Sequence, residues 1–389
     1  MNVLFVHYGD DWIAGSEIAL LEMMRGLEKT GITPFLWCNA PAMEQAALAW
    51  GFPVRRDDFA YYFDYSSPRF SPSAYLGLVR KAMAMISRTG AQLVHCNSAA
   101  PAQFMSAACW RKDVPWLINM HSPYLRRSRY VLGMHLADQV VAVASAIAAP
   151  LIADGMAPDR VSVVYNGFDE QALMQGDAKG LRAELQIPGD AIVGAIAGSL
   201  IRRKGHDILF EAMRLLPQGV RPFHVLVIGD GPERTGLEAA ASGLPVHFLG
   251  RRNDLGAILR DAADFLAAPS RQEAFGRVII EAAFAGIPAV GANVDGIPEA
   301  ILDQTTGILV PPESPAFLAD ALSRLVADEP LRRRLGLAAQ ARARAQFSIE
   351  ICAAKMAAEI HRIRARHDAG NPGLSLLNRL KPYGNLVRR

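Results

Sequence analysis

The sequence contains few cysteines, and their spacing offers neither a disulfide framework nor a metal site. Cys38, Cys96, Cys109 and Cys352 are scattered along 389 residues, without a C-x-x-C pair or a histidine at metal-ligand spacing. This pattern is typical of buried, reduced thiols. The chain also lacks an Asp-x-Asp pair and a cluster of histidines with carboxylates. We therefore expect no bound metal.

Signals for export or membrane insertion are missing as well. The first residues, MNVLFVHYGDDW, lack the cationic segment of a signal peptide and run directly into an apolar strand pattern. The longest apolar window, 132–152, is interrupted by His135, Asp138 and Gln139. Its pattern predicts helix, strand and helix instead of a membrane span. These features indicate a cytoplasmic protein, with any membrane contact peripheral.

A strong charge of either sign is also absent. The net charge is +3, with 20% of residues charged and 51% hydrophobic. This composition is typical of a folded globular protein, and the basic excess is too small to indicate nucleic acid as a partner. Because a chain of this length exceeds one ordinary core, we expect two domains.

Short β-branched runs alternate with alanine-rich helical segments in the first half of the chain. Strands are predicted at 2–7, 33–38, 91–96, 115–120, 139–143 and 161–165, with helices such as 16–29 and 73–89 between them. The runs lack strict polar alternation, which favours strands buried on both faces of a parallel sheet.

The alternation restarts after a polar, glycine-rich segment at 166–190, where we place the domain boundary. Strands are predicted at 191–197, 224–228, 246–249, 264–268, 288–292 and 307–310, and helices at 205–216, 232–242 and 276–285. The fold class is therefore α/β, with two tandem Rossmann-like, doubly wound domains. Because ligands bind beyond the carboxyl ends of such strands, the expected site is an interdomain cleft.

Two glutamates stand out in the loop and helix after one predicted strand. Glu273 lies just before a helix that begins near Gly276, and Glu281 lies on its second turn. The amides of Phe275, Gly276 and Arg277 are then helix N-terminal donors. Carboxylates accept from hydroxyl groups and amides donate to oxygens, which suits a polyhydroxylated ligand. The alternative is that Glu273 caps the helix and Glu281 is solvated.

A cationic loop follows the strand at 191–197. Arg202, Arg203 and Lys204 precede a glycine and a helix start. Guanidinium, ammonium and a helix terminus together suit a diphosphate, although a solvated charge run has the same pattern.

Two further residues follow strands of the first half. Gly15 stands in the loop after the first strand, where backbone can approach a phosphate closely, although an ordinary turn explains it equally. His121 ends the strand at 115–120 and so lies at the ligand-binding edge, with a structural histidine as the alternative. The segment GDGPER fails the G-x-G-x-x-G pattern at Arg234, which disfavours a nicotinamide dehydrogenase.

Together these motifs resemble a known family. The stretch PSRQEAFGRVIIEAAFAGIPAVGANVDGIPE resembles the E-x7-E signature of the retaining GT-B glycosyltransferases of family 4. The other pieces occur in the same order: Gly15-Ser16-Glu17, VVYNGFD at 163–169, Lys204-Gly205 and VIGDGPE at 227–233. The resemblance covers roughly residues 1–365 and is strongest in 160–310. It implies an acceptor domain at 1–170, joined by a C-terminal helix at about 350–389, and a nucleotide-sugar domain at 171–349.

The resemblance also implies how the sugar and nucleoside are held. Glu273, helped by the amides of Phe275 and Gly276, would bind hydroxyls of the donor sugar. Glu281 would take the ribose hydroxyls, and His121 would lie near the sugar and the acceptor.

For the diphosphate, the resemblance implies a cationic wall. Arg203 and Lys204 would neutralise the leaving diphosphate, with the Gly15 amide on the opposite side. Many relatives carry arginine where this chain has Ser199, so either Arg203 or Arg202 would replace it.

The resemblance implies the transfer of a hexose-type sugar from a UDP-, GDP- or ADP-sugar to a hydroxyl group of a glycan or lipid-linked acceptor, in polysaccharide biosynthesis. The transfer would retain the anomeric configuration and would need neither a metal nor a cofactor. The cationic stretches 124–130 and 378–389 suggest peripheral contact with an anionic membrane, although solvated helix faces explain them equally. The alternatives are a nucleotide-sugar epimerase or a phosphorylase on the same fold, or a non-catalytic nucleotide-sugar-binding subunit.

Overall fold

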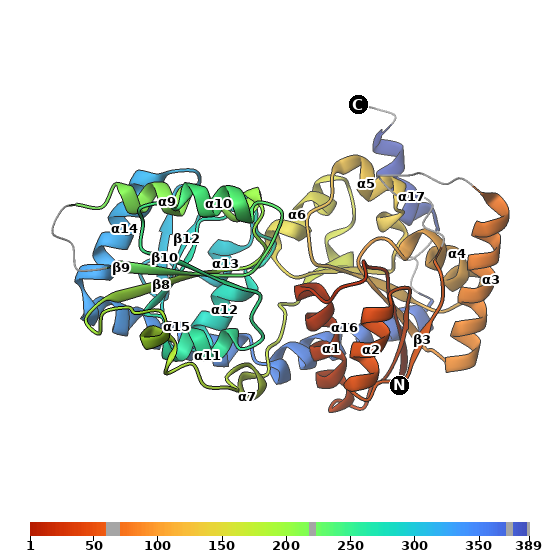
Figure 1. Ribbon diagram of the computed structural model, residues 1–389. Helices are drawn as coiled ribbons and strands as arrows, with labels where there is room; N and C mark the ends of the chain where they lie inside the picture. Colours follow the sequence, from red (N-terminus) through yellow and green to blue (C-terminus); the bar gives the residue numbers. More distant parts are fainter. Residues whose placement is uncertain (60–70, 218–222, 371–375, 387–389) are drawn as a thin grey trace. The chain divides into compact units, whose positions relative to one another are not determined.

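The computed structural model describes residues 1–59, 71–217, 223–370 and 376–386 (Figure 1). The chain forms two compact units: an N-terminal unit of Met1–Gly167 with Ile349–Arg389, and a C-terminal unit of Phe168–Ser348. Each unit is a parallel sheet covered by helices, which confirms the predicted α/β class with two doubly wound halves.

The sheet of the N-terminal unit has seven strands in the order β3-β2-β1-β4-β5-β6-β7. These are β1 (Asn2–His7), β2 (Thr33–Cys38), β3 (Val54–Arg56), β4 (Leu93–Asn97), β5 (Trp116–Met120), β6 (Gln139–Ala142) and β7 (Val161–Val163). The chain begins inside the sheet, winds to one edge and then crosses to the other. Strands β4 and β5 are buried along their whole length, and most of their side chains are apolar on both faces.

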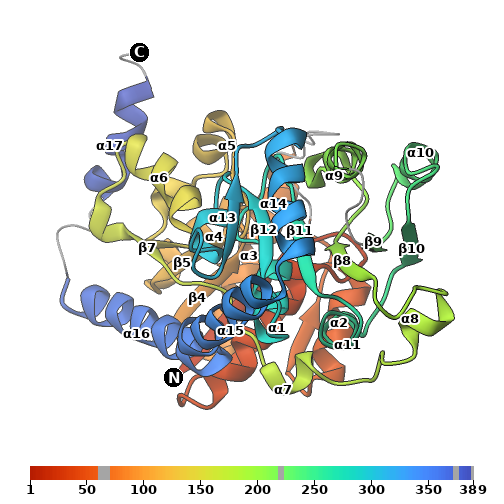
Figure 2. The same ribbon diagram turned by 90° about the vertical axis from the view of Figure 1, so that its left-hand side faces the viewer.

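The helices of the N-terminal unit come from both ends of the chain. They are α1 (Gly15–Glu28), α2 (Pro41–Ala49), α3 (Pro72–Thr89), α4 (Ala102–Lys112), α5 (Arg126–Val131), α6 (Ser145–Ala153), α16 (Ile349–Asp368) and α17 (Leu376–Leu386). Single turns of 3-10 helix occur at η1 (Met134–Leu136) and η2 (Pro158–Arg160). Helix α16 packs along α1 (Figure 2), and its Cys352, Met356 and Ile360 share a buried core with β1 and α1.

Helix α17 is fixed to the same unit by polar contacts. The Arg379 guanidinium donates to the carbonyl of Leu136 at 2.9 Å and forms an ion pair with the buried carboxylate of Asp138. The Tyr383 hydroxyl donates to the carbonyl of Tyr130 at 3.0 Å. Part of the cationic tail is therefore structural, and its last residues, 387–389, lie outside the described residues.

The C-terminal unit repeats the doubly wound plan with six strands in the order β10-β9-β8-β11-β12-β13. The strands are β8 (Ile192–Ala197), β9 (Phe223–Ile228), β10 (Val246–Gly250), β11 (Phe265–Ala268), β12 (Ala289–Ala292) and β13 (Gly307–Val310). The helices are α7 (Glu170–Leu173), α8 (Leu181–Glu184), α9 (His206–Arg214), α10 (Arg234–Ala240), α11 (Leu255–Asp261), α12 (Arg277–Phe284), α13 (Ile297–Ala300), α14 (Pro315–Ala327) and α15 (Glu329–Gln346), with a 3-10 turn at η3 (Arg202–Lys204).

The strands and helices predicted from the sequence agree with the structure to within two residues at each end. Two differences concern short elements. Strand β3 was not predicted, and the cationic run Arg202–Lys204, predicted as a loop, forms the 3-10 turn η3.

The structure also describes the surroundings of the cysteines and the polarity of the helices. All four cysteines are buried thiols, and burial raises the pKa of Cys38 and Cys352 to about 12. Across the described ranges, every helix is too short or too polar to cross a bilayer. In the same ranges, no three histidine, cysteine or carboxylate side chains gather as a metal site requires.

We predict that the contact between α1 and α16 is sensitive to one added methyl group. A Cβ at Gly26 would lie 2.6 Å from the Cβ of Ala353 and 3.0 Å from Ile349. Because neither neighbour can move far, Gly26→Ala is expected to destabilise the protein by about 1–3 kcal/mol despite its better helix propensity. Thermal unfolding measures the change.

The matched control is Gly77→Ala in α3, where an added Cβ meets no atom within 4 Å. Removing a helical glycine there is expected to stabilise by up to about 1 kcal/mol. A Gly26→Ala variant as stable as Gly77→Ala would contradict the packing.

Candidate functional site

Two loops at the carboxyl edge of the C-terminal sheet lie against each other. The first follows β8 and contains Gly198, η3 and Gly205, and the second follows β11. Gly205 has φ +73°, and a Cβ there would lie 2.1 Å from the carbonyl oxygen of Pro269. Only glycine permits this conformation and this approach together. As a result, the last residue of η3, Lys204, lies beside the loop after β11.

Arg271 joins these two loops, and the sequence analysis missed it. Its amide donates to the carbonyl of Arg203 at 2.7 Å, and its guanidinium donates to the carbonyl of Arg202 at 2.8 Å. The same guanidinium bonds Asp207 at 2.8 and 2.9 Å and Glu313 at 2.8 Å. These hydrogen bonds hold the pKa of Asp207 below its usual value, although burial opposes them. The guanidinium therefore fixes the relative position of the two loops.

The approach of the loops brings Lys204 and Glu273 together. The Lys204 Nζ forms an ion pair with Glu273 Oε2, and the two side chains are only 15% and 12% exposed. The Glu273 backbone is held by the loop after β12, because its amide donates to Asp295 at 3.0 Å and its carbonyl accepts from Gly296 at 3.0 Å. The helix cap of α12 is Gly276, without a side-chain hydrogen bond, so Glu273 is not the cap.

Glu281 is buried beside this pair on α12, so it is not the solvated residue of the alternative interpretation. It is 8% exposed, and its Oε1 lies 3.8 Å from the Arg277 guanidinium. Arg277 in turn lies over the ring of Phe168, 4.3 Å from its centroid. Burial raises the pKa of Glu281, while the charges of Arg277 and Lys204 lower it. The site thus contains a second carboxylate within the electrostatic reach of Lys204.

The remaining predicted residues of this unit lie around the pair. The side chains of Arg202 and Arg203 are exposed, and Arg203 donates to the carbonyl of Gln272 at 3.3 Å. The Phe275 side chain is buried with its ring 5.6 Å from that of Phe347, so only its backbone can contact a ligand. Gly276, with φ +82°, starts α12, whose first amides have no acceptor within their own helix.

Gly15 and His121 belong to the N-terminal unit, at the carboxyl edge of its own sheet. Gly15 is the first residue of α1, next to the cap residue Ala14, whose amide donates to Glu17 Oε2 at 3.1 Å. His121 follows β5, and its Nε2 lies 2.7 Å from Asn97 Oδ1. Asn97 ends β4, and the sequence analysis did not single it out.

Two family profiles match the chain. Glycosyltransferase Family 4 matches residues 13–172, and Glycosyl transferases group 1 matches residues 177–342. The chain belongs to the glycosyltransferase family that these two profiles describe, and it has the GT-B fold. The matches meet close to the junction of the two units.

Individual relatives agree with this assignment. The D-inositol 3-phosphate glycosyltransferase of Saccharomonospora viridis is 31% identical over 299 residues, which are 72% of this chain and 65% of that protein. The chain thus spans less than two thirds of this relative's length.

Solved structures of the same fold cover nearly the whole chain. Anabaena HepE, solved in complex with UDP and glucose, has a TM-score of 0.79 at 21% identity and covers 93% of this chain and 100% of its own. Sucrose-phosphate synthase from Thermosynechococcus elongatus has a TM-score of 0.73 at 21% identity, covering 94% of this chain and 99% of its own. The predicted GT-B fold is confirmed.

The raised pKa of Glu281 predicts a pH-dependent stability difference. The folded protein holds this proton more tightly than the unfolded chain, so ionisation of Glu281 above its ordinary pKa costs stability as the pH rises. Glu281→Gln removes the charge. The gain in melting temperature over the wild type is expected to be small near pH 4 and to grow towards about pH 8.

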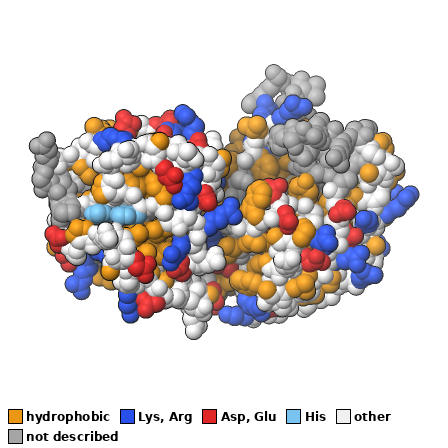
Figure 3. Space-filling view, in the orientation of Figure 1, with side chains coloured by type: hydrophobic (Ala, Val, Ile, Leu, Met, Phe, Trp, Pro, Cys, Tyr) orange, Lys and Arg blue, Asp and Glu red, His pale blue; other side chains and the backbone are white. Residues whose placement is uncertain are grey.

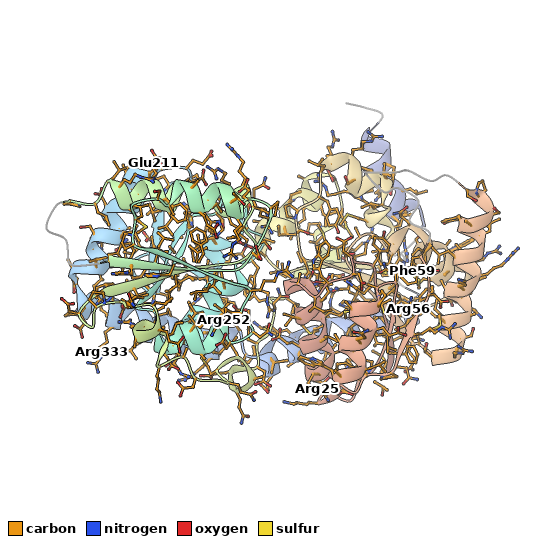
Figure 4. All side chains as sticks on the ribbon, viewed as in Figure 1. Arg25, Arg56, Phe59, Glu211, Arg252 and Arg333 are labelled. Atoms are coloured by element: carbon orange, nitrogen blue, oxygen red, sulfur yellow. The ribbon has the colours of Figure 1, made fainter. Side chains whose placement is uncertain are left out.

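The exposed Glu211 of α9, which points outward from the unit (Figure 4), provides the control. Glu211→Gln is expected to give no such trend. A Glu281→Gln variant that is no more stable than the wild type at pH 8 would show that Glu281 carries no electrostatic cost.

Proposed function

We propose that this protein transfers a hexose-type sugar, with retention and without a metal, from a nucleoside-diphosphate sugar to a hydroxyl group of a glycan or lipid-linked acceptor. The observation that carries the proposal is the partly buried Lys204–Glu273 pair with Glu281 beside it. One cation and two carboxylates at a strand edge match the diphosphate and the hydroxyl groups of such a donor.

Lys204 and its loop have the role of stabilising the leaving group. Breaking the bond between sugar and diphosphate builds negative charge on the β-phosphate, and a preorganised ammonium lowers that barrier. Without a ligand, Lys204 is neutralised by Glu273. A donor offers each partner a new contact, phosphate oxygen for Lys204 and sugar hydroxyls for Glu273. Arg202 and Arg203 are exposed on the same turn and add positive charge next to the proposed phosphate position.

Glu281 has the role of binding the ribose. A buried carboxylate is costly unless hydrogen bonds satisfy it. The two ribose hydroxyls can donate to its two oxygens, which would offset the desolvation that raises its pKa. The amides at the start of α12, around Phe275 and Gly276, would meet sugar or phosphate oxygens.

The comparisons support a uridine nucleotide first among the candidate bases. HepE is described in complexes with UDP, with UDP and glucose, and with UDP-glucose. The S. viridis relative takes its name from a phosphorylated polyol, D-inositol 3-phosphate. We therefore place UDP-glucose first in a donor screen and include inositol phosphate among the acceptors.

We also propose a cytoplasmic location with peripheral contact to an anionic membrane, and the structure supports this contact with fewer exposed cations than the sequence suggested. Arg129 is buried against Asp154 at 2.6 Å, and Arg379 is bound to Asp138. Leu125, Arg126 and Arg127 are exposed at the start of α5, although Arg126 also lies 3.5 Å from the Asp154 carboxylate. On the face shown in Figure 3, cationic and anionic side chains are interspersed over both units.

Co-sedimentation with vesicles tests this contact. The wild type is expected to bind vesicles containing anionic lipid at low salt and to be released by salt, with the double variant Arg126→Ala, Arg127→Ala binding several-fold more weakly. A wild type that stays in the supernatant would exclude membrane contact through this surface.

A donor screen followed by product analysis tests the transfer itself. UDP, GDP and ADP and their glucose derivatives are compared by thermal shift, because a ligand that binds the folded state raises the melting temperature. Glycoside formation with the α-anomeric configuration of the donor is expected. An epimerised donor without acceptor, or turnover only with inorganic phosphate, would favour the epimerase or phosphorylase instead.

Substitutions of the central pair test the site. Lys204→Ala and Glu273→Ala are each expected to lower turnover by at least about 100-fold, the scale of one lost transition-state contact. Glu281→Ala is expected mainly to weaken nucleotide binding in calorimetry. Lys179→Ala and Glu211→Ala, exposed in the same unit, are the charge-matched controls. Near-normal turnover in both Lys204→Ala and Glu273→Ala would refute the assignment.

A further inference from the structure

Four polar side chains of the N-terminal unit form a continuous chain of contacts. Glu17 Oε1 lies 3.2 Å from His7 Nε2, His7 Nδ1 lies 3.1 Å from Asn97 Nδ2, and Asn97 Oδ1 lies 2.7 Å from His121 Nε2. This series of contacts runs across neighbouring strands of the sheet. His7 ends β1, Asn97 ends β4 and His121 follows β5. His7 and Asn97 are direct register partners. We call these four side chains the relay.

The inner members of the relay are shielded from water. His7 is 3% exposed, Asn97 1% and Glu17 8%. Burial disfavours the Glu17 carboxylate, yet its contacts with His7 and Ser16 lower its pKa to about 2. Glu17 is therefore ionised at neutral pH and acts only as an acceptor.

The loop after β1 covers this contact. A Cβ at Gly9 would lie 2.6 Å from His7 Nε2 and 3.3 Å from Glu17 Oε1. The loop is held in place by Asn39, which accepts from the Gly9 amide at 2.9 Å and donates to the Gly9 carbonyl at 2.8 Å. The glycine in HYGDDW thus allows backbone to close over the histidine–carboxylate pair.

The donor and acceptor roles along the relay follow from the Glu17 end. A carboxylate requires hydrogen on His7 Nε2, and His7 Nδ1 is the acceptor for the Asn97 Nδ2 that faces it at 3.1 Å. The Asn97 amide must then present its NH₂ to His7 and its oxygen to His121. An amide oxygen requires hydrogen on His121 Nε2.

We propose that Glu17, through His7 and Asn97, fixes His121 in the tautomer with hydrogen on Nε2 and makes its Nδ1 an acceptor. Glu17, His7 and Asn97 are then positioning residues, and His121 is the group that they orient. The consequence for chemistry rests on the proposed function: Nδ1, which is buried in the protein without a ligand, would accept a hydrogen bond from a sugar or acceptor hydroxyl, whereas it repels a phosphate oxygen.

Nitrogen-15 NMR of the histidine rings in the full chain tests the relay independently of activity. The chain has nine histidines, and His121 is assigned from the signals lost in His121→Gln. Two-bond couplings are expected to show hydrogen on Nε2 of His121 and a bare Nδ1. Hydrogen on Nδ1 of His121, or an even mixture of the two tautomers, would overturn the inference.

Two substitutions at one position separate the relay from simple structural support. Asn97→Ala removes the acceptor, so the His121 tautomers are expected to become mixed. Asn97→Asp keeps an acceptor for His121 Nε2, so the tautomer of His121 is expected to be retained. Asp154→Asn, which disturbs a different buried ion pair of the same unit, is expected to leave the His121 signals unchanged.

Kinetics then connect the relay to turnover. Asn97→Ala is expected to lower kcat by about tenfold or more with a smaller change in KM, and Asn97→Asp to recover part of the loss. If Asn97→Ala mixes the His121 tautomers but leaves kcat unchanged, the relay has no role in transfer. If the protein transfers no sugar, the NMR results still decide the tautomer, so failure of the proposed function and failure of the relay are distinguishable.

Discussion

The candidate site of the C-terminal unit depends on the close approach of two loops. Gly205 places the chain against the Pro269 carbonyl, where a side chain does not fit, and Arg271 then bonds both loops through main chain and side chain. Lys204 and Glu273, which are 69 residues apart in sequence, meet only because of this approach. The proposed catalytic geometry therefore depends first on how the backbone of the two loops packs, and the charges of Lys204 and Glu273 act only once the loops are in place.

The charges at the site are arranged in a way that stability alone does not explain. Taking an ion pair out of water costs much of what its attraction returns, so a partly buried pair is weak evidence of stabilisation. Glu281 adds a carboxylate whose ionisation is opposed by burial and only partly compensated by Arg277 and Lys204. Such groups are satisfied better by a ligand that supplies hydroxyl donors and phosphate oxygens, which is why we propose that a donor sugar binds at this edge of the sheet.

Local sequence was enough to predict the fold and the central pair, but not the groups that position them. Apolar runs between alanine-rich helices located nearly every strand, whereas β3 escaped because two of its three residues are exposed arginines. Glu273 and Lys204 were found because each follows a strand. Arg271 was not, because its partners lie far away in sequence and acquire meaning only on folding. Asn97 was missed for another reason: it is the last residue of a buried strand, and nothing in the local sequence marks it as a functional residue.

The two units use the same device for different chemistry. In each, a glycine allows a close approach at the carboxyl edge of a sheet: Gly9 approaches the side chains of His7 and Glu17, and Gly205 approaches the backbone carbonyl of Pro269. The C-terminal unit thereby gathers charge, which suits a diphosphate. The N-terminal unit gathers a relay whose outer member, His121, is neutral and accepting in our proposal, which suits a hydroxyl group. A glycosyl donor and its acceptor need both, since the leaving group becomes anionic while the nucleophile must lose a proton.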